Sequence, residues 1–281
     1  MVSKYVTSSD GAQIYTEAYG DPSKPALILV AGYTMNTIAF EKQIELSKDL
    51  YLVLYDMRGH GRSAMPETPA GHESKLYADD FAAGMCVVKE YKLKKPVFGG
   101  WSLGGTIVAD VCHHLGADAL GGVILIAAVP FLDLLPKIVS PEILGLVPGI
   151  MEKSDVKKSR EASRAFGKTL FYDEERVPFA TRLAWMGSIL LMPPTTSELV
   201  ITRKQDGTKF LEAAKAGLKV MCIHGEQDVQ RTSGMAVVEH LQPHYKNIKV
   251  VAIDKAGHSV FYEQPEQTNK AFLEFVKECN A

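Results

Sequence analysis

Short, continuous runs of apolar residues recur along the chain, separated by amphipathic stretches. The runs are ALILVA at 26–31, YLVLYD at 51–56, PVFGG at 96–100, GGVILIAA at 121–128, KVMCIH at 219–224 and KVVAID at 249–254. They are too short for helices and rich in Val, Ile and Leu, which is typical of strands that are buried on both faces. They therefore predict a parallel sheet that is covered by helices on both sides.

The stretches between these runs predict the covering helices. Apolar residues recur at helical spacing in 74–91 and 103–115, and a final helix is expected to begin at Pro265. Before the first run, Gln13 to Tyr19 alternates between apolar and polar residues and follows a turn, which indicates an antiparallel ribbon. Alternating strands and helices predict the α/β class, with a doubly wound, mostly parallel central sheet.

One long segment breaks this alternation. Residues 131–217 contain several helical patterns and the pair Pro193-Pro194, but no convincing buried strand. We interpret this segment as a helical cap inserted into an α/β core that is formed by residues 1–130 and 218–281. Its apolar side chains either face the sheet or simply pack against one another within the cap.

A serine lies at the turn between a predicted strand and a predicted helix. The pentapeptide Gly100-Trp101-Ser102-Leu103-Gly104 follows the run PVFGG directly. It fits the nucleophile-elbow pattern, in which a sharp turn exposes the serine oxygen and the helix N-terminus favours developing negative charge. The alternative is a plain strand-to-helix turn in which Ser102 caps the helix. The strand before it and the helix after it favour a nucleophile.

The expected general base is His258, in a loop between the run KVVAID and the final helix. Ligand sites in open α/β sheets lie at the carboxyl ends of the strands, so His258 and Ser102 can meet in space. The other histidines are expected to be solvated or to cap turns and helices; they are His60, His72, His113, His114, His224, His240 and His244.

The expected acid is Asp228, which follows the run KVMCIH by a few turn residues. It would orient the imidazole and stabilise the imidazolium ion. Asp133, Asp254 and Glu226 are the alternatives, because each also lies near the end of a predicted strand. Asp228 has the best position, and the chain order Ser, Asp, His agrees with this architecture.

An oxyanion hole needs two backbone N–H donors near the nucleophile. Leu103, the residue after the serine, supplies one of them. The second is expected from Tyr33, in the loop after the first apolar run, where Gly32 permits a tight path. The tyrosine ring itself can be explained as a wall of the pocket.

With these motifs, the chain resembles the α/β-hydrolase superfamily, in particular its serine esterase-like branch with a helical cap. The segment Asp56-Met57-Arg58-Gly59-His60-Gly61-Arg62-Ser63 is similar to the family's D-x-R-G-x-G-x-S loop. The resemblance implies a triad of Ser102, Asp228 and His258 and oxyanion donors at Tyr33 and Leu103. Many members have His-Gly where this chain has Ala-Gly at 31–32. Epoxide hydrolases and haloalkane dehalogenases use aspartate at the elbow, and Ser102 argues against both.

Composition and charge argue against a nucleic-acid-binding or membrane-spanning protein. The chain has 281 residues and a formal net charge of -2, which leaves no basic footprint for nucleic acid. No signal-peptide core or membrane span is apparent, so we expect a cytoplasmic location. The four cysteines are far apart and are interpreted as free core thiols; they are Cys86, Cys112, Cys222 and Cys279.

These features predict a serine hydrolase that needs no metal and no cofactor. The expected substrate is a small, uncharged, fairly hydrophobic carboxylic ester or lactone, cleaved through an acyl-enzyme on Ser102. Trp185 and Met186 in the cap and Ser259 beside the base are expected to bind it. The alternatives are acyl transfer, C–C bond hydrolysis or perhydrolysis by the same triad, and a small-molecule receptor that has lost catalysis.

Overall fold

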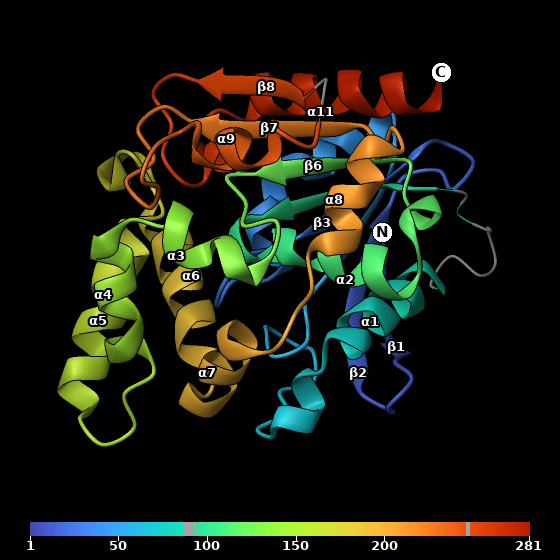
Figure 1. The fold of residues 1–281 in the computed structure, drawn as a ribbon. Coiled ribbons are helices and arrows are strands. Elements are labelled where there is room, and N and C mark those ends of the chain that lie inside the picture. Colours follow the sequence, from blue (N-terminus) through green and yellow to red (C-terminus); the bar gives the residue numbers. More distant parts are fainter. Residues whose placement is uncertain (87–92, 94, 246–247) are drawn as a thin grey trace.

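A single eight-stranded sheet runs through the molecule (Figure 1). The computed structural model describes residues 1–86, 93, 95–245 and 248–281. The strand order is β1-β2-β4-β3-β5-β6-β7-β8. The strands are β1 (Val2–Thr7), β2 (Gln13–Tyr19), β3 (Ala26–Val30), β4 (Tyr51–Tyr55), β5 (Val97–Trp101), β6 (Gly122–Ile126), β7 (Val220–Gly225) and β8 (Ile248–Ile253).

The strand pairing confirms the predicted α/β fold with a mostly parallel sheet. β1 and β2 form an antiparallel ribbon, and β2 is also antiparallel to β4. The pairs from β4 through β3, β5, β6 and β7 to β8 are all parallel. The prediction of burial on both faces is wrong for β8, where Val250 is 39% exposed, because β8 lies at the edge of the sheet with β7 as its one neighbour.

Helices cover the sheet and also form the long insertion between β6 and β7. The α-helices are α1 (Ser74–Cys86), α2 (Ile107–His114), α3 (Leu135–Ile138), α4 (Pro141–Ile150), α5 (Val156–Lys168), α6 (Phe179–Leu191), α7 (Pro194–Thr202), α8 (Thr208–Lys215), α9 (Ala236–Leu241), α10 (Val260–Glu263) and α11 (Pro265–Asn280). The 3-10 helices are η1 (Thr37–Lys48), η2 (Pro69–His72), η3 (Ser102–Thr106), η4 (Ala117–Ala119), η5 (Leu132–Leu134) and η6 (Glu174–Arg176).

The predicted helices are present where the structure describes them. The final helix α11 begins at Pro265 as expected. The predicted helix over 74–91 is described as far as Cys86, and its remaining residues lie outside the described part of the chain. The helix expected near Leu103 begins as the 3-10 turn η3 and continues as α2.

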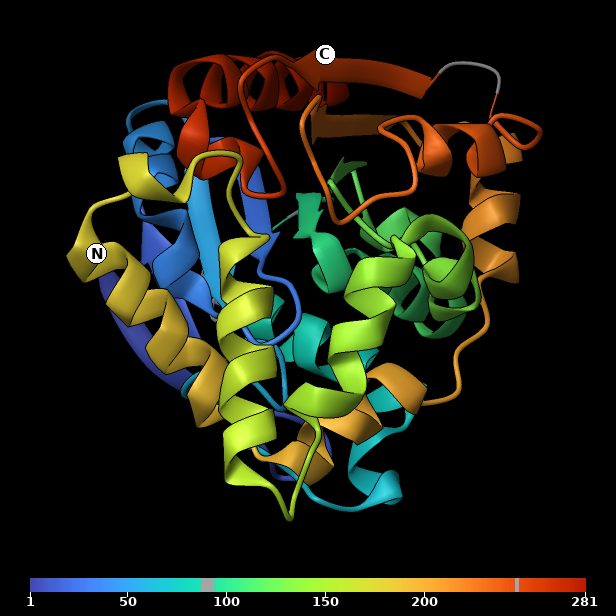
Figure 2. The same cartoon turned by 90° about the vertical axis from the view of Figure 1, so that its left-hand side faces the viewer.

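The inserted helices gather on one side of the molecule. The arrowheads of β6, β7 and β8 point toward the side on which α4, α5 and α6 lie, so these helices are near the carboxyl ends of the strands (Figure 1). Figure 2 views the molecule from that side, with the lime and gold helices in front of the sheet. Helix α8, although part of the same insertion, lies beside the sheet (Figure 1). The division of the chain at 131 and 217 stays a prediction.

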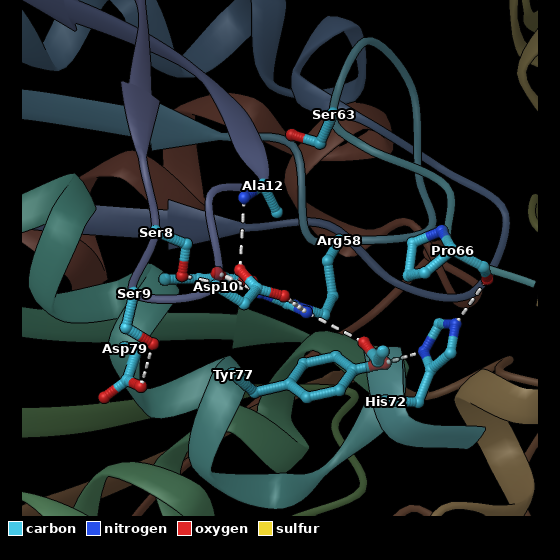
Figure 3. Close-up of polar contacts among 12 residues, drawn as sticks. Ser8, Ser9, Asp10, Ala12, Arg58, Ser63, Pro66, His72, Tyr77 and Asp79 are labelled. Atoms are coloured by element: carbon cyan, nitrogen blue, oxygen red, sulfur yellow. Dashed lines mark hydrogen bonds and ion pairs between the residues drawn. The ribbon is translucent and has the colours of Figure 1, made fainter. Parts of the chain in front are cut away.

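The loop after β4 is anchored by a buried arginine. Nε and one terminal nitrogen of Arg58 each donate a hydrogen bond of 2.7 Å to the Asp80 carboxylate in α1. The guanidinium also donates to Asp10, in the turn between β1 and β2, and to the Gly71 carbonyl (Figure 3). Bidentate pairing of this kind satisfies a charge that burial would otherwise penalise. The loop is therefore fixed to both the ribbon and α1.

The cysteines agree with the prediction of free thiols as far as they are described. Cys112 and Cys222 are buried, and Cys279 is half-buried. Burial raises the pKa of the Cys112 and Cys222 thiols to about 12, so both are protonated at neutral pH. The side chain of Cys86 lies outside the described residues. None of the described helices is long and apolar enough to cross a membrane.

Candidate active site

The turn after β5 holds Ser102 in a strained backbone conformation. Its φ angle is +51°, a region that residues other than glycine seldom occupy. A Cβ atom at Gly100 would lie 2.5 Å from the backbone of Gly105, and one at Gly104 would lie 2.5 Å from the Ala31 carbonyl oxygen. Side chains at either position would therefore clash. The G-x-S-x-G pattern is needed here for steric reasons, and it leaves Ser102 at the tip of the turn.

A buried carboxylate and imidazole face each other across the loops after β7 and β8. Nδ1 of His258 donates to Oδ2 of Asp228 at 2.8 Å, and the side chains are 2% and 1% exposed. Burial raises the pKa of the Asp228 carboxyl, but the charge and hydrogen bond of His258, with smaller effects of Arg231 and the Gln230 N–H, lower it below its usual value. Asp228 is therefore ionised at neutral pH and fixes the orientation of the ring.

The other nitrogen of His258 remains available. Within the described part of the chain, Nε2 of His258 is buried and has no hydrogen-bond partner. The indole N–H of Trp101 donates to the His258 carbonyl at 2.9 Å, and the two rings are 5.6 Å apart. Because Trp101 immediately precedes Ser102, this hydrogen bond ties the loop that carries His258 to the turn that carries Ser102. The structure thus brings His258 next to the segment that carries Ser102.

The loop after β3 passes directly beside the serine. A Cβ atom at Gly32 would lie 2.7 Å from Cβ of Ser102 and 3.3 Å from its hydroxyl oxygen. Tyr33 follows immediately, and its backbone N–H donates no hydrogen bond among the described residues. Leu103 is the second residue of η3, and the first N–H groups of a helix lack an acceptor within that helix. The two residues expected to donate these N–H groups therefore lie in segments that flank Ser102, and their role in an oxyanion hole stays a prediction.

Helices of the insertion contact the loop after β3. The hydroxyl of Tyr33 hydrogen bonds to the Ser197 hydroxyl in α7, and its ring packs edge-on against Phe166 of α5 at 5.9 Å. The amide of Asn36 donates to the Ser188 hydroxyl in α6 at 2.9 Å. The tyrosine ring is thus more than a pocket wall, because it connects the predicted oxyanion loop to the cap.

Comparison with known proteins shows the family of this chain. A family model described as the alpha/beta hydrolase family matches residues 27–271. The chain belongs to the alpha/beta hydrolase family. A bifunctional esterase/perhydrolase of Acinetobacter calcoaceticus is 26% identical, with 97% of this chain and 99% of that relative aligned. A non-heme chloroperoxidase of Streptomyces lividans is 31% identical over 44% of each chain.

Solved structures have the same fold. An esterase from Rhodococcus sp. ECU1013 matches with a TM-score of 0.86 and 23% identity, covering 99% of both chains. An enol-lactonase from Burkholderia xenovorans LB400 matches with a TM-score of 0.77 and 20% identity, covering 98% of this chain and all of the other. These matches extend over the cap as well as the sheet of this α/β-hydrolase.

The residues predicted to bind substrate lie in different surroundings. Trp185 of α6 is buried, and its ring is 5.8 Å from that of Trp101, the residue before Ser102. Met186 is half-buried and is oriented toward α5, where its methyl group approaches Gly167. Ser259 is buried, and its hydroxyl has no hydrogen-bond partner among the described residues. Of the three, Trp185 is the residue with a described ring contact to the segment that carries Ser102.

The alternative acids of this hydrolase lie outside the site. Asp133, Glu226 and Asp254 are exposed, and Asp254 accepts a hydrogen bond from Gln227. None of them contacts His258 through the interactions of the described residues. Asp228 is thus the carboxylate that the structure brings to the imidazole.

Of the two roles expected for the other histidines, solvated or capping, burial excludes the solvated one for three of them. His60, His72 and His224 are all buried. Burial lowers the pKa of His60 to about 4, and it also lowers the pKa of His72 and His224. All three are therefore neutral at pH 7. His60 contacts the Arg58 carbonyl and His72 contacts the Pro66 carbonyl, which agrees with the capping role for these two.

Two residues of the site were missed by the sequence analysis. Glu263 accepts hydrogen bonds from the Gly257 N–H at 2.7 Å and from the Tyr172 N–H at 2.6 Å, so it joins the base loop to the cap. Burial raises the pKa of Glu263, although these hydrogen bonds counteract it. Arg231 lies behind Asp228, with 3.8 Å between Nε and Oδ2. A glutamate at the end of a short helix and an arginine in a loop are usually solvated, so the sequence carried no signal for either.

Proposed function

We propose that this α/β-hydrolase is a carboxylic ester hydrolase, with Ser102 as nucleophile, His258 as general base and Asp228 as the acid that orients it. The observation that supports the proposal best is the buried 2.8 Å hydrogen bond between His258 and Asp228, tied through Trp101 to the strained serine turn. Relatives named as esterases and hydrolases also favour a hydrolase.

The reaction would proceed through an acyl-enzyme. Oγ of Ser102 attacks the ester carbonyl carbon while its proton passes to Nε2 of His258. The backbone N–H groups of Tyr33 and Leu103 stabilise the negative charge on the carbonyl oxygen. Collapse of the intermediate releases the alcohol, which takes the proton from His258. Water then attacks the acyl group by the same sequence, and the acid leaves as Ser102 regains its proton.

Aromatic residues beside the nucleophile favour an uncharged, fairly hydrophobic substrate. The ring of Trp185 is 4.7 Å from that of Phe171 and 5.3 Å from that of Tyr262. Such surfaces bind apolar groups through area and ring contacts rather than through charge. A small ester or lactone suits these surroundings, and we propose that the cap over 131–217 selects among such substrates.

The function is tested by hydrolysis of p-nitrophenyl esters from acetate to palmitate, with Ser102→Ala in parallel. We expect activity with an optimum at one chain length and a loss of about a thousandfold or more in the variant, since it lacks the nucleophile. Ester turnover within tenfold of wild type in Ser102→Ala would refute the mechanism. Tight ester binding with negligible turnover in the wild type would indicate a receptor instead.

Perhydrolysis is a second candidate function. One relative, aligned over nearly its full length, is named as a bifunctional esterase/perhydrolase. Another, aligned over 44% of its length, is named as a non-heme chloroperoxidase. In this reaction hydrogen peroxide replaces water in the attack on the acyl-enzyme, so a peracid leaves in place of the acid. The same assay with added hydrogen peroxide tests it: Ser102-dependent peracid formation would support the second activity, and its absence would limit the protein to hydrolysis.

A further inference from the structure

A buried arginine lies directly behind the acid of the Asp228–His258 pair. Arg231 follows Asp228 by three residues, in the loop between β7 and α9, and its side chain is 4% exposed. Nε is 3.8 Å from Oδ2 of Asp228. This distance allows strong electrostatic attraction, but it is too long for a hydrogen bond.

The terminal nitrogens of Arg231 are unpaired. Neither of them has a hydrogen-bond partner among the residues that the structure describes. Arg231 lines a cavity of ≈ 10 Å³, which is also lined by His224, Gly234 and apolar side chains. A space of this size has room for about one water molecule. It has no room for a carboxylate or another oxyanion, so Asp228 is the anionic group that balances the guanidinium.

The other buried arginines of this chain are bound very differently. Arg203 donates two hydrogen bonds, of 2.9 and 2.7 Å, to Asp110. Arg58 holds Asp80 with two of 2.7 Å. Both have the bidentate geometry expected of an arginine that stabilises the fold. Arg231 lacks this geometry, although its burial is just as unfavourable for a charge. Its location is therefore poorly explained by a purely structural role.

The backbone keeps Arg231 in this position. It forms an antiparallel bridge with Val139, at the start of the insertion. On either side, Thr232 N–H donates to the Ile138 carbonyl at 3.0 Å, and Ser140 N–H donates to the Gln230 carbonyl at 2.9 Å. The guanidinium is therefore held against the acid by a short two-stranded pairing between the acid loop and the inserted segment.

We propose that Arg231 is a positioning residue whose charge sets the pH range in which the Asp228–His258 pair works as a base. This inference rests on the proposed function of the pair. A positive charge beside the pair disfavours a second positive charge on the imidazole. Arg231 therefore keeps His258 in its neutral, proton-accepting form at lower pH than the Asp228 carboxylate alone would allow.

Two titratable groups and two glutamates lie in the surroundings of Arg231 and Asp228. Burial lowers the pKa of His224 and raises the pKa of Cys222 to about 12, so both side chains are neutral. Glu226 is exposed to solvent, and Glu263 approaches Asp228 from α10. Burial lowers the pKa of Arg231 itself to about 10, so it stays charged through the working range. Arg231 is thus the cation that faces the acid.

The test is the pH dependence of kcat/KM for one ester in the wild type, Arg231→Met, Arg231→Gln and Arg231→Lys. We expect the acid limb of both neutral variants to move to higher pH by about one pH unit, from a Coulomb interaction at this range. Arg231→Lys keeps the charge and should retain the wild-type limb. The exposed Arg176→Met, whose side chain is 81% accessible, is the control for net charge and should also retain it.

Measurements at high ionic strength, together with a check that each variant folds, separate the effect of the Arg231 charge from the effects of surface charge and of misfolding. Because the pair is buried, the displacement should persist at high ionic strength, where surface charges are screened. A folded neutral variant with the wild-type acid limb would overturn the proposal. If neither neutral variant folds, Arg231→Lys provides the test. This variant keeps the positive charge, so an acid limb that moves up by about one pH unit in it would also overturn the proposal. In either case Ser102-dependent wild-type activity leaves the esterase assignment standing, and its absence removes that assignment instead.

Discussion

Buried polar side chains of this hydrolase are of two kinds. Arg58 and Arg203 are paired with carboxylates through short, bidentate hydrogen bonds, and they hold loops and helices together. The imidazole of His258, the guanidinium of Arg231 and the imidazole of His60 each retain a buried nitrogen without a partner in the described part of the chain. Unpaired buried groups are unfavourable, so they concentrate where function or tight packing requires them.

His60 should make the stability of the protein depend on pH. Nδ1 of His60 contacts the Arg58 carbonyl at 3.1 Å, and burial lowers the pKa of the ring to about 4. The unfolded chain binds the proton near pH 6.5, so the stability contributed by neutral His60 is complete above that pH and is lost as the pH falls to 4. We expect the free energy of unfolding to fall by about 3 kcal/mol more in the wild type than in His60→Gln.

Urea unfolding at pH 7 and at pH 4 measures this difference. His113→Gln, at a partly exposed position of α2, controls for the loss of a histidine as such. Equal pH dependence in the wild type and His60→Gln would mean that His60 is protonated in the folded protein or that its site opens to solvent.

Among the elements, the cap helices and the oxyanion loop form a connected unit. Helices α5, α6 and α7 each contact the loop through Phe166, Ser188 and Ser197. Within the loop, Thr34 has a φ angle of +64°, which is unfavourable for a β-branched residue. Contacts from three helices can hold such a conformation, and the position of the Tyr33 N–H therefore depends on the cap.

Removing the contact between Tyr33 and Ser197 should lower kcat more than it raises KM. Tyr33→Phe keeps the ring and the backbone N–H but loses the hydroxyl, and Ser197→Ala removes the other partner. We expect a decrease of about three- to tenfold in kcat for each variant, because a displaced N–H donor stabilises the transition state less well. The double variant should be no worse than either single one, since both remove the same hydrogen bond. Additive losses, or unchanged kcat in both single variants, would contradict this coupling.

The elements themselves follow closely from the sequence. The apolar runs and the alternation at Gln13–Tyr19 predicted β2 to β8, and the elbow and loop motifs predicted which turns carry Ser102 and His258. Exposure of β8 was missed, because a Val- and Ile-rich run reads the same at an edge as in the middle of a sheet. The contacts of Tyr33 with the cap and the position of Arg231 were missed because they join segments far apart in sequence, for which local patterns give no information.

In the whole molecule, parallel strands bring the three proposed catalytic residues together. Ser102 follows β5, Asp228 follows β7 and His258 follows β8, and all three strands point toward the same edge of the sheet. Turns and loops at that edge can change in sequence while the sheet stays intact. The sheet therefore holds the site in place, whereas the turns and loops supply its chemistry. The inserted helices α4, α5 and α6 lie in front of the same edge (Figure 2). Specificity is therefore expected to depend on the cap, and the chemistry on the strand ends.

The role of Ser102 as nucleophile is tested most directly by covalent trapping with a fluorophosphonate, followed by peptide mass spectrometry. Attack by Oγ of Ser102 forms an O–P bond and expels fluoride, while the proton passes to His258. If Ser102 is the nucleophile, we expect one label per chain on the peptide that contains Ser102, loss of ester hydrolysis in proportion to labelling, and slow labelling of His258→Ala. Labelling at another residue, or full activity after complete labelling of Ser102, would contradict it.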